Sequence, residues 1–248
     1  MGYIVYNQLD YGDVPYPSKS LPKATVKSGG CGVVCMMILL ANMAAVELSA
    51  KAAAAYAIKK GARVEGGTDM FAVCKALEKD YGFDWSVTND VNEMLRHVAD
   101  NGFAVANVSG DRAGYTGVYS NGGHYVVVAG ATEDRLVVLD PAHYVGKFTK
   151  AGRAGKVQDI GGGVTSCAAT VLNEDTKTRN PAYYLFSREG FTMEKFPDTK
   201  GHWAEASIKK AVEKGVLKGK GDGLFSPDEP LTRAELATVL DRLGLLDK

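Results

Sequence analysis

The chain has 248 residues with 46% hydrophobic and 23% charged side chains, a composition typical of a globular protein that excludes wholesale disorder. Its 29 acidic residues balance 29 lysines and arginines, so the net charge gives no bulk attraction to nucleic acid or to an anionic membrane. The most apolar stretch, residues 33–40, is far shorter than the roughly 20 residues of a membrane span. The sequence therefore predicts no nucleic-acid partner and no membrane span.

The first half of the chain predicts helices. After an extended loop over residues 5–28, a helix opens at Gly30-Cys31-Gly32 and runs to about Met43. Its residues are apolar on every side, so this helix should cross the middle of a core. Ser49 suits the N-cap of a second helix over residues 50–60. Two amphipathic helices fit the segments 69–80 and 90–100.

The pattern then changes to short runs rich in β-branched and aromatic residues, which predict strands over residues 103–108, 125–129, 135–139 and 183–186. Helices followed by strands predict an α+β fold, with helices packed on an antiparallel sheet. Residues 152–163 are rich in Gly and Lys, and we interpret them as a mobile loop rather than a phosphate-binding loop.

The composition shifts again near residue 190. A helix follows Phe196-Pro-Asp-Thr-Lys-Gly-His-Trp203, and Thr232-Arg-Ala-Glu235 forms a capping box that opens the last helix. These features predict a small helix–loop–helix unit, with Trp203 and Phe225 in its core. We place a first domain at residues 1–190 and this second unit at residues 195–248.

The four cysteines predict one reactive thiol and three buried ones. Cys35, Cys74 and Cys167 read as core residues, because cysteine is among the most buried residue types. Their spacing fits neither a disulfide framework nor a zinc site, so we predict no metal and no cofactor. Cys31 differs because it stands between glycines at a helix start, where backbone N–H groups favour the thiolate. The flanking glycines would let a substrate approach closely.

A thiol nucleophile needs a base and an orienting group, and later residues offer both. His124 opens an apolar strand and would act as base and then as general acid, while Asp140 at a strand end would fix its tautomer. Gln8 and the Cys31 N–H would stabilise the oxyanion. Each has a plainer interpretation: a core histidine, an aspartate that initiates a turn, and a solvated glutamine. His143 is the second choice for the base, and His97 reads as structural.

The order Gln8, Gly-Cys31-Gly, Gly-His124-Tyr and Leu-Asp140-Pro resembles the papain-like C39 peptidases and their C39-like relatives, over roughly residues 3–187. The resemblance implies a papain-like fold with Cys31 as nucleophile, His124 as base, Asp140 as orienting acid and Gln8 in the oxyanion hole. Cys35 departs from the pattern, because many relatives carry a small polar residue one turn after the nucleophile.

The tail resembles a single S-layer homology motif over residues 196–243, on Phe196-Pro-Asp-Thr, Gly201-His-Trp-Ala, Phe225-Ser-Pro and Thr232-Arg-Ala-Glu235. Such motifs imply non-covalent binding to the secondary polysaccharide of a Gram-positive cell wall, for which Trp203 and Arg233 are the candidate contacts. One helical repeat cannot bury its apolar face alone. We therefore expect it to dock on the first domain or to associate with other chains, as a trimer if three chains pool their repeats.

Together these features predict a cysteine peptidase or amidase held at a Gram-positive cell wall. Peptidoglycan peptides are the favoured substrate, as for a phage-type endolysin, and cell-surface proteins come second. The alternative is a non-catalytic protein that binds surface peptides and polysaccharide. A transglutaminase-like or acyltransferase activity is a third reading, since it shares the Cys-His-Asp chemistry. The sequence starts without a signal peptide, which predicts either later release from the cytoplasm or prior removal of the signal.

Overall fold

The computed structural model describes residues 2–131, 135–188, 196–199, 201–213, 216–217, 219 and 224–246. The chain divides into two compact units, Gly2–Phe191 and Thr192–Lys248. The predicted boundary between residues 190 and 195 lies outside the described residues. Each unit is therefore treated by itself.

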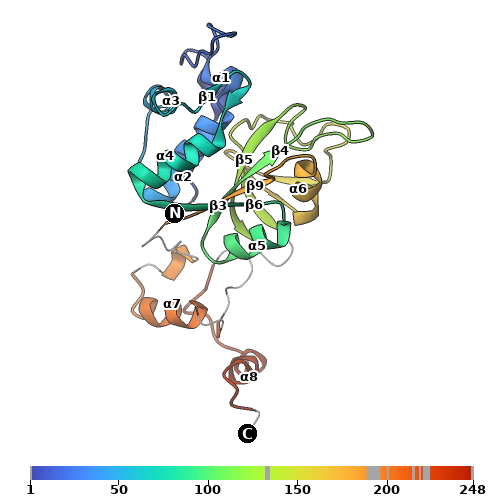
Figure 1. Cartoon of the computed structure of the whole chain (residues 1–248). Coiled ribbons are helices and arrows are strands. Elements are labelled where there is room, and N and C mark those ends of the chain that lie inside the picture. Colours follow the sequence, from blue (N-terminus) through green and yellow to red (C-terminus); the bar gives the residue numbers. More distant parts are fainter. Residues whose placement is uncertain are drawn as a thin grey trace. The chain divides into compact units, whose positions relative to one another are not determined.

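The first unit is helical over residues 31–44, 50–59 and 70–81, as the sequence predicts, but two short helices also lie at residues 8–10 and 26–29, in or at the end of the segment 5–28 for which an extended loop is predicted. A short 3-10 helix η1 (Gln8–Asp10) precedes the helices α1 (Val26–Gly29), α2 (Cys31–Ala44), α3 (Ala50–Lys59) and α4 (Met70–Tyr81), with a hairpin of β1 (Arg63–Val64) and β2 (Gly67–Thr68) between the last two. Helix α2 is buried along nearly its whole length, which confirms its predicted place in a core. Figure 1 shows α1 to α4 gathered on one side of this unit and the sheet on the other.

The rest of the first unit is built on one antiparallel sheet. Within the described residues its order is β3-β9-β4-β5-β6-β8-β7, formed by β3 (Phe83–Thr88), β4 (Phe103–Val108), β5 (His124–Ala131), β6 (Leu136–Leu139), β7 (Val157–Gly161), β8 (Val164–Cys167) and β9 (Tyr183–Arg188). Helices α5 (Val91–Ala99) and α6 (Ala169–Thr176) cover the core on one face of the sheet (Figure 1). The fold is α+β, as predicted.

Five strands and two α-helices of the described residues are not among the predicted elements, namely β1, β2, β3, β7, β8, α1 and α6. The interpretation of residues 152–163 as a mobile loop is wrong, because Val157–Gly161 forms the edge strand β7 on β8. Its residues are mostly exposed, and its two apolar side chains, Val157 and Ile160, are three positions apart, so it lacks the alternation of apolar residues that marks a half-buried strand. It is a strand because its backbone pairs with β8, the next strand along the chain, which in turn pairs with β6 in the sheet.

A buried carboxylate ties α6 to the loop before β5. Asp175 is fully buried; its Oδ1 accepts hydrogen bonds from Val118 N at 2.8 Å and the Tyr115 hydroxyl at 3.0 Å, and its Oδ2 accepts one from Tyr119 N at 3.0 Å. Because every partner is a donor, both oxygens must remain acceptors. This carboxylate therefore anchors the loop that leads to His124.

The Asp175→Asn variant tests this anchor. The amide NH2 cannot accept a hydrogen bond, so one buried donor loses its partner and the free energy of unfolding should fall by about 1–3 kcal/mol. Urea denaturation followed by circular dichroism measures the change. The matched control is Asp84→Asn, an exposed position on β3, which should leave stability unchanged within about 0.5 kcal/mol. Equal effects of the two substitutions would contradict the assignment.

The second unit contains a 3-10 helix η2 (Pro197–Thr199) and the helices α7 (Glu205–Glu213) and α8 (Arg233–Arg242). The predicted capping box is confirmed, with Thr232 and Glu235 bonded reciprocally. The rings of Phe196 and Phe225 lie 5.4 Å apart. The predicted core position of Trp203 is wrong, since this side chain is 91% exposed. It lies in the turn before α7, outside the helical periodicity that would direct it inward.

Candidate active site

Cys31 is the first residue of α2, directly after the N-cap Gly30. The N–H groups of a first helical turn have no acceptor within the helix, so they are available to an anion. Cys31 is partly exposed, whereas Cys35, Cys74 and Cys167 are fully buried, and all four are free thiols. The prediction that Cys35, Cys74 and Cys167 are core residues is confirmed.

Close packing explains the glycines beside the thiol. A Cβ on Gly30 would lie 2.6 Å from the carbonyl oxygen of Val26, and one on Gly32 would lie 2.7 Å from Cβ of Thr68. Both approaches are shorter than real Cβ atoms tolerate. The glycines therefore let α2 start against its neighbours, so that Cys31 remains at the surface of a tightly packed segment.

The Gly32→Ala variant is expected to displace the start of α2. The added methyl group meets the branched side chain of Thr68, so we expect a loss of about 1–3 kcal/mol in unfolding free energy and a slower reaction of Cys31 with iodoacetamide. The matched control is Gly66→Ala, where a Cβ would meet nothing within 4 Å. If both variants keep wild-type stability and labelling rate, the packing argument fails.

Pairing of β5 with β6 brings His124 and Asp140 together. The register places Val127 opposite Leu139. Extended by one residue, it sets Asp140 opposite Val126, which makes His124 and Asp140 diagonal neighbours on the same face. His124 Nε2 lies 3.1 Å from Oδ1 of Asp140, and both side chains are buried. The spacing of sixteen residues thus follows from an antiparallel hairpin.

The orientation of His124 leaves its other ring nitrogen for the thiol. Because Nε2 faces Asp140, Nδ1 is the ring nitrogen that remains for the interaction with Cys31. Burial disfavours the imidazolium, but the hydrogen bonds and negative charges of Asp140 and Cys31 outweigh it and raise the pKa of His124 to about 9. Burial likewise opposes ionisation of the Cys31 thiol, yet His124 and the N–H groups of Tyr125 and Gly32 lower its pKa below the ordinary value. The pair therefore favours a thiolate beside an imidazolium.

Sequence reasoning missed Lys147. Its ammonium is buried and donates to Oδ2 of Asp140 at 2.6 Å and to the carbonyl oxygen of Ala142 at 3.2 Å. Burial disfavours the Asp140 carboxylate, but its bond to His124 and the charge of Lys147 lower the pKa of Asp140 to about 2. In the sequence, Gly-Lys147-Phe-Thr-Lys reads as a solvated turn, so the sequence carries no signal for this contact.

Gln8 joins the two segments that carry the nucleophile and the aspartate. Its backbone N–H donates to Pro141 O at 2.6 Å, and its Nε2 donates to Lys27 O at 3.0 Å, four residues before Cys31. The side chain is buried, so the solvated interpretation is wrong. An amide nitrogen carries two hydrogens, and Lys27 takes one of them.

The other histidines of the first unit lie in different contacts. His143, the alternative base, has Nε2 2.8 Å from Oδ2 of Asp159, and His97 Nε2 lies 2.9 Å from Phe186 O. Neither has Cys31 among its hydrogen-bond partners in the described residues. His143 and Asp159 are also sixteen residues apart, like His124 and Asp140, so spacing alone does not identify the functional pair.

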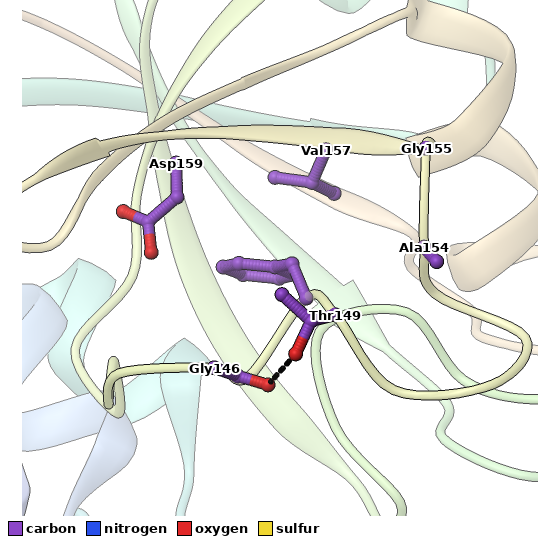
Figure 2. Close-up of a pocket in the computed structure, with 7 residues that line it drawn as sticks. Gly146, Thr149, Ala154, Gly155, Val157 and Asp159 are labelled. Carbon is purple, nitrogen blue, oxygen red and sulfur yellow. Dashed lines mark hydrogen bonds between the residues drawn. The ribbon is translucent and has the colours of Figure 1, made fainter.

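A pocket of about 340 Å³ lies beside the Lys147 segment, lined by Gly146, Phe148, Thr149, Ala154, Gly155, Val157 and Asp159 (Figure 2). Figure 2 shows Asp159 and Val157 across the pocket from Gly146 and Thr149, whose hydroxyl donates to the Gly146 carbonyl at 3.0 Å. The floor is mostly apolar, and Asp159 is already paired with His143. The pocket therefore offers few polar groups that are open to a ligand, and none of Cys31, His124 and Asp140 lines it.

The arrangement is suited to acyl transfer through a thiolate. His124 is bonded to Asp140 and interacts with Cys31, whose thiol is at the partly exposed end of this series. Among the described residues, no group of three or more His, Cys, Asp or Glu side chains is placed to hold a metal ion. None of the described helices is both long and apolar enough to cross a membrane.

Comparison with known proteins bears mainly on the tail. Residues 195–237 match the family model of the S-layer homology domain. The chain is 45% identical over 49 residues to S-layer protein EA1 of Bacillus anthracis, which covers 19% of this chain and 6% of that protein. It is 54% identical over 39 residues to cell surface glycoprotein 1 of Acetivibrio thermocellus, covering 16% of this chain and 2% of that protein. The chain thus spans only a small part of these relatives.

A search of solved structures finds a distant similarity. The peptidase domain of Streptococcus ComA, a bifunctional ABC transporter involved in quorum sensing, aligns with a TM-score of 0.43 and 16% sequence identity. The alignment covers 64% of this chain and 91% of that domain.

In the S-layer homology segment, both candidate wall contacts are open. Trp203 is 91% exposed with its ring 5.6 Å from that of His202, and Arg233 is exposed at the start of α8. Asp198 instead has a structural role, because its carboxylate accepts from the N–H groups of Phe225 and Ser226. The segment therefore exposes Trp203 and Arg233 to solvent, while Asp198 and the capping box of Thr232 and Glu235 hold its backbone.

Proposed function

We propose that the protein is a cysteine peptidase or amidase of the papain-like C39 type that acts on peptides at the Gram-positive cell wall. The observation that carries this proposal is the buried His124 ring, which is bonded to Asp140 through Nε2 and faces the partly exposed thiol of Cys31. A purely structural histidine needs neither an accessible cysteine nor a buried carboxylate. Resemblance of the sequence motifs to that family points the same way.

Cys31 attacks the carbonyl carbon of the scissile amide as a thiolate. His124 then donates its Nδ1 proton to the leaving nitrogen, the C–N bond breaks, and the acyl group remains on sulfur as a thioester. A water molecule attacks the thioester while Nδ1 of the now neutral His124 takes its proton. Release of the carboxylic acid restores the thiolate and the imidazolium, so atoms and charge balance over the cycle.

The negative oxygen of each tetrahedral intermediate needs donors. The N–H of Cys31 lies in the first helical turn and is the first candidate. The remaining Nε2 hydrogen of Gln8 is the second, since Gln8 is anchored at Lys27 and Pro141 on either side of the site. Asp140 keeps Nε2 of His124 bonded, so that Nδ1 faces the reaction.

The S-layer homology segment supports a location at the cell surface. A domain that holds the hydrolase at a wall raises the concentration of wall peptides around Cys31. Peptidoglycan stem and cross-bridge peptides are therefore the favoured substrate class, with an endolysin-like outcome, and Trp203 and Arg233 are the proposed contacts with wall polysaccharide.

Digestion of purified Gram-positive cell walls, with mass spectrometry of the soluble fragments, tests the proposal. We expect new amine and carboxyl termini in the products of the wild-type protein and none with Cys31→Ala. The matched control is Cys35→Ala, which removes a thiol one turn away and should retain hydrolysis. Wall binding without fragment release would favour the non-catalytic binder. Fragments joined to an added amine would favour acyl transfer, and hydrolysis that survives in Cys31→Ala would overturn the proposal.

A further inference from the structure

Asp140 is paired with a second cation, the ammonium of Lys147, which the proposed mechanism does not require for proton transfer. Lys147 is 2% exposed, and its ammonium lies 2.6 Å from Oδ2 of Asp140. Lysine is almost never fully buried without a specific partner. Oδ1 is already bonded to Nε2 of His124 and to the N–H of Ala142 at 3.0 Å. The carboxylate is therefore held at both oxygens.

We propose that Lys147 is a positioning residue of the triad, which fixes the Asp140 carboxylate through Oδ2 so that Oδ1 stays directed at His124. This inference rests on the proposed function. The ammonium reaches Asp140 from the turn that follows it in the chain, and a second bond to the carbonyl oxygen of Ala142 at 3.2 Å fixes its approach. Its side chain acts on the reaction only through Asp140.

A permanent cation is needed because His124 changes its charge during the cycle. When His124 is an imidazolium, the buried Asp140 has a positive partner even without Lys147. When His124 has given up its proton, Asp140 would be a buried anion with no counter-charge, a state that favours uptake of a proton. Lys147 keeps Asp140 ionised in both states. While His124 is an imidazolium, the charges of Cys31, His124, Asp140 and Lys147 alternate in sign.

Other titratable groups also lie near this chain of charges among the described residues, and Tyr16 and Tyr125 sense the charge of Cys31. Cys35 and Tyr119 sense the charge of Asp140, and burial raises the pKa of both. The ring of Tyr144 lies 5.9 Å from the Lys147 ammonium, and its hydroxyl accepts from Lys150 at 2.8 Å. None of these groups replaces the cation at Oδ2 of Asp140.

The test is the pH dependence of iodoacetamide labelling at Cys31, read by mass spectrometry, in the full chain with Lys147→Met. Loss of the cation leaves one excess negative charge beside His124 and near Cys31. The labelling profile has two limbs, one set by the pKa of Cys31 and one by the pKa of His124. Both limbs should therefore move to higher pH by at least about half a unit. The kcat for peptide hydrolysis should fall at neutral pH, while KM should change little. Lys147→Arg keeps the charge and should restore the limbs toward wild-type positions.

The matched control is Lys150→Met, which removes the same charge from an exposed position on the same turn. Its limbs should stay at the wild-type pH. Folding of each variant is checked by circular dichroism. If Lys147→Met does not fold, Lys147→Gln keeps hydrogen-bond donors without the charge and should give the same upward shift. If the labelling profile of the folded neutral variant, Lys147→Met or Lys147→Gln, has both limbs at the wild-type pH, the proposed role of Lys147 is wrong. A wild-type Cys31 with an ordinary thiol profile would instead contradict the proposed function itself.

Discussion

Replacing His124 by alanine is expected to slow peptide hydrolysis by about 10³-fold or more, because the thiol loses both its base and the general acid for the leaving amine. Iodoacetamide labelling of Cys31 at pH 6 should fall as well, since the imidazolium that lowers the pKa of Cys31 is absent. Initial rates on a cleaved wall peptide and the labelled mass of the protein measure the two effects.

His143→Ala is the control for this variant. His143 is paired with Asp159 at the same sixteen-residue spacing, at 2.8 Å, but Cys31 is not among its hydrogen-bond partners in the described part of the chain. It should keep both the hydrolysis rate and the low-pH labelling. If His143→Ala loses activity and His124→Ala does not, the assignment of the base is wrong.

Asp140→Asn is expected to cost both activity and stability. The amide cannot accept at both oxygens, so either His124 loses the acceptor at Nε2 or Lys147 faces an NH2 group. We expect a loss on the order of 10³-fold in hydrolysis because the tautomer of His124 is no longer fixed. Removal of one partner of a buried ion pair should also lower the unfolding free energy by about 3–5 kcal/mol.

Asp159→Asn is the matched control for Asp140→Asn, because it changes the other His–Asp pair at a more exposed site. Its activity should stay near wild type, and its stability should change by less than about 1 kcal/mol. Urea denaturation and peptide hydrolysis measure the two variants side by side. Comparable losses in both would show that the carboxylate of Asp140 has no special role.

The pH dependence of the wild type follows from the same pair. The thiolate–imidazolium state exists above the lowered pKa of Cys31 and below the pKa of His124, which is raised to about 9. Because that folded-state pKa exceeds the unfolded value of about 6.5, the stability from His124 is present below 6.5 and lost as the pH rises through 9. Asp140, with its pKa lowered to about 2, contributes stability that disappears only as the pH falls through that value.

The sequence by itself determined the features that depend on residues close in the chain. The glycine-framed start of α2, its all-round apolar surface, the cap at Ser49 and the capping box at Thr232 are local signals, and the structure has each of them. The contact between His124 and Asp140 was predictable because one hairpin joins their strands, so a spacing of sixteen residues still reflects a local geometry.

Only the tertiary structure decided which groups meet across the chain. His124 and His143 have the same spacing to an aspartate, and the packing of α2 against β5 places only the first beside Cys31. Lys147 is a buried partner of Asp140, although its sequence surroundings are those of a solvated turn. The physical reason is that burial and the choice of partner depend on contacts between distant segments, whereas caps and periodicity are set by neighbouring residues.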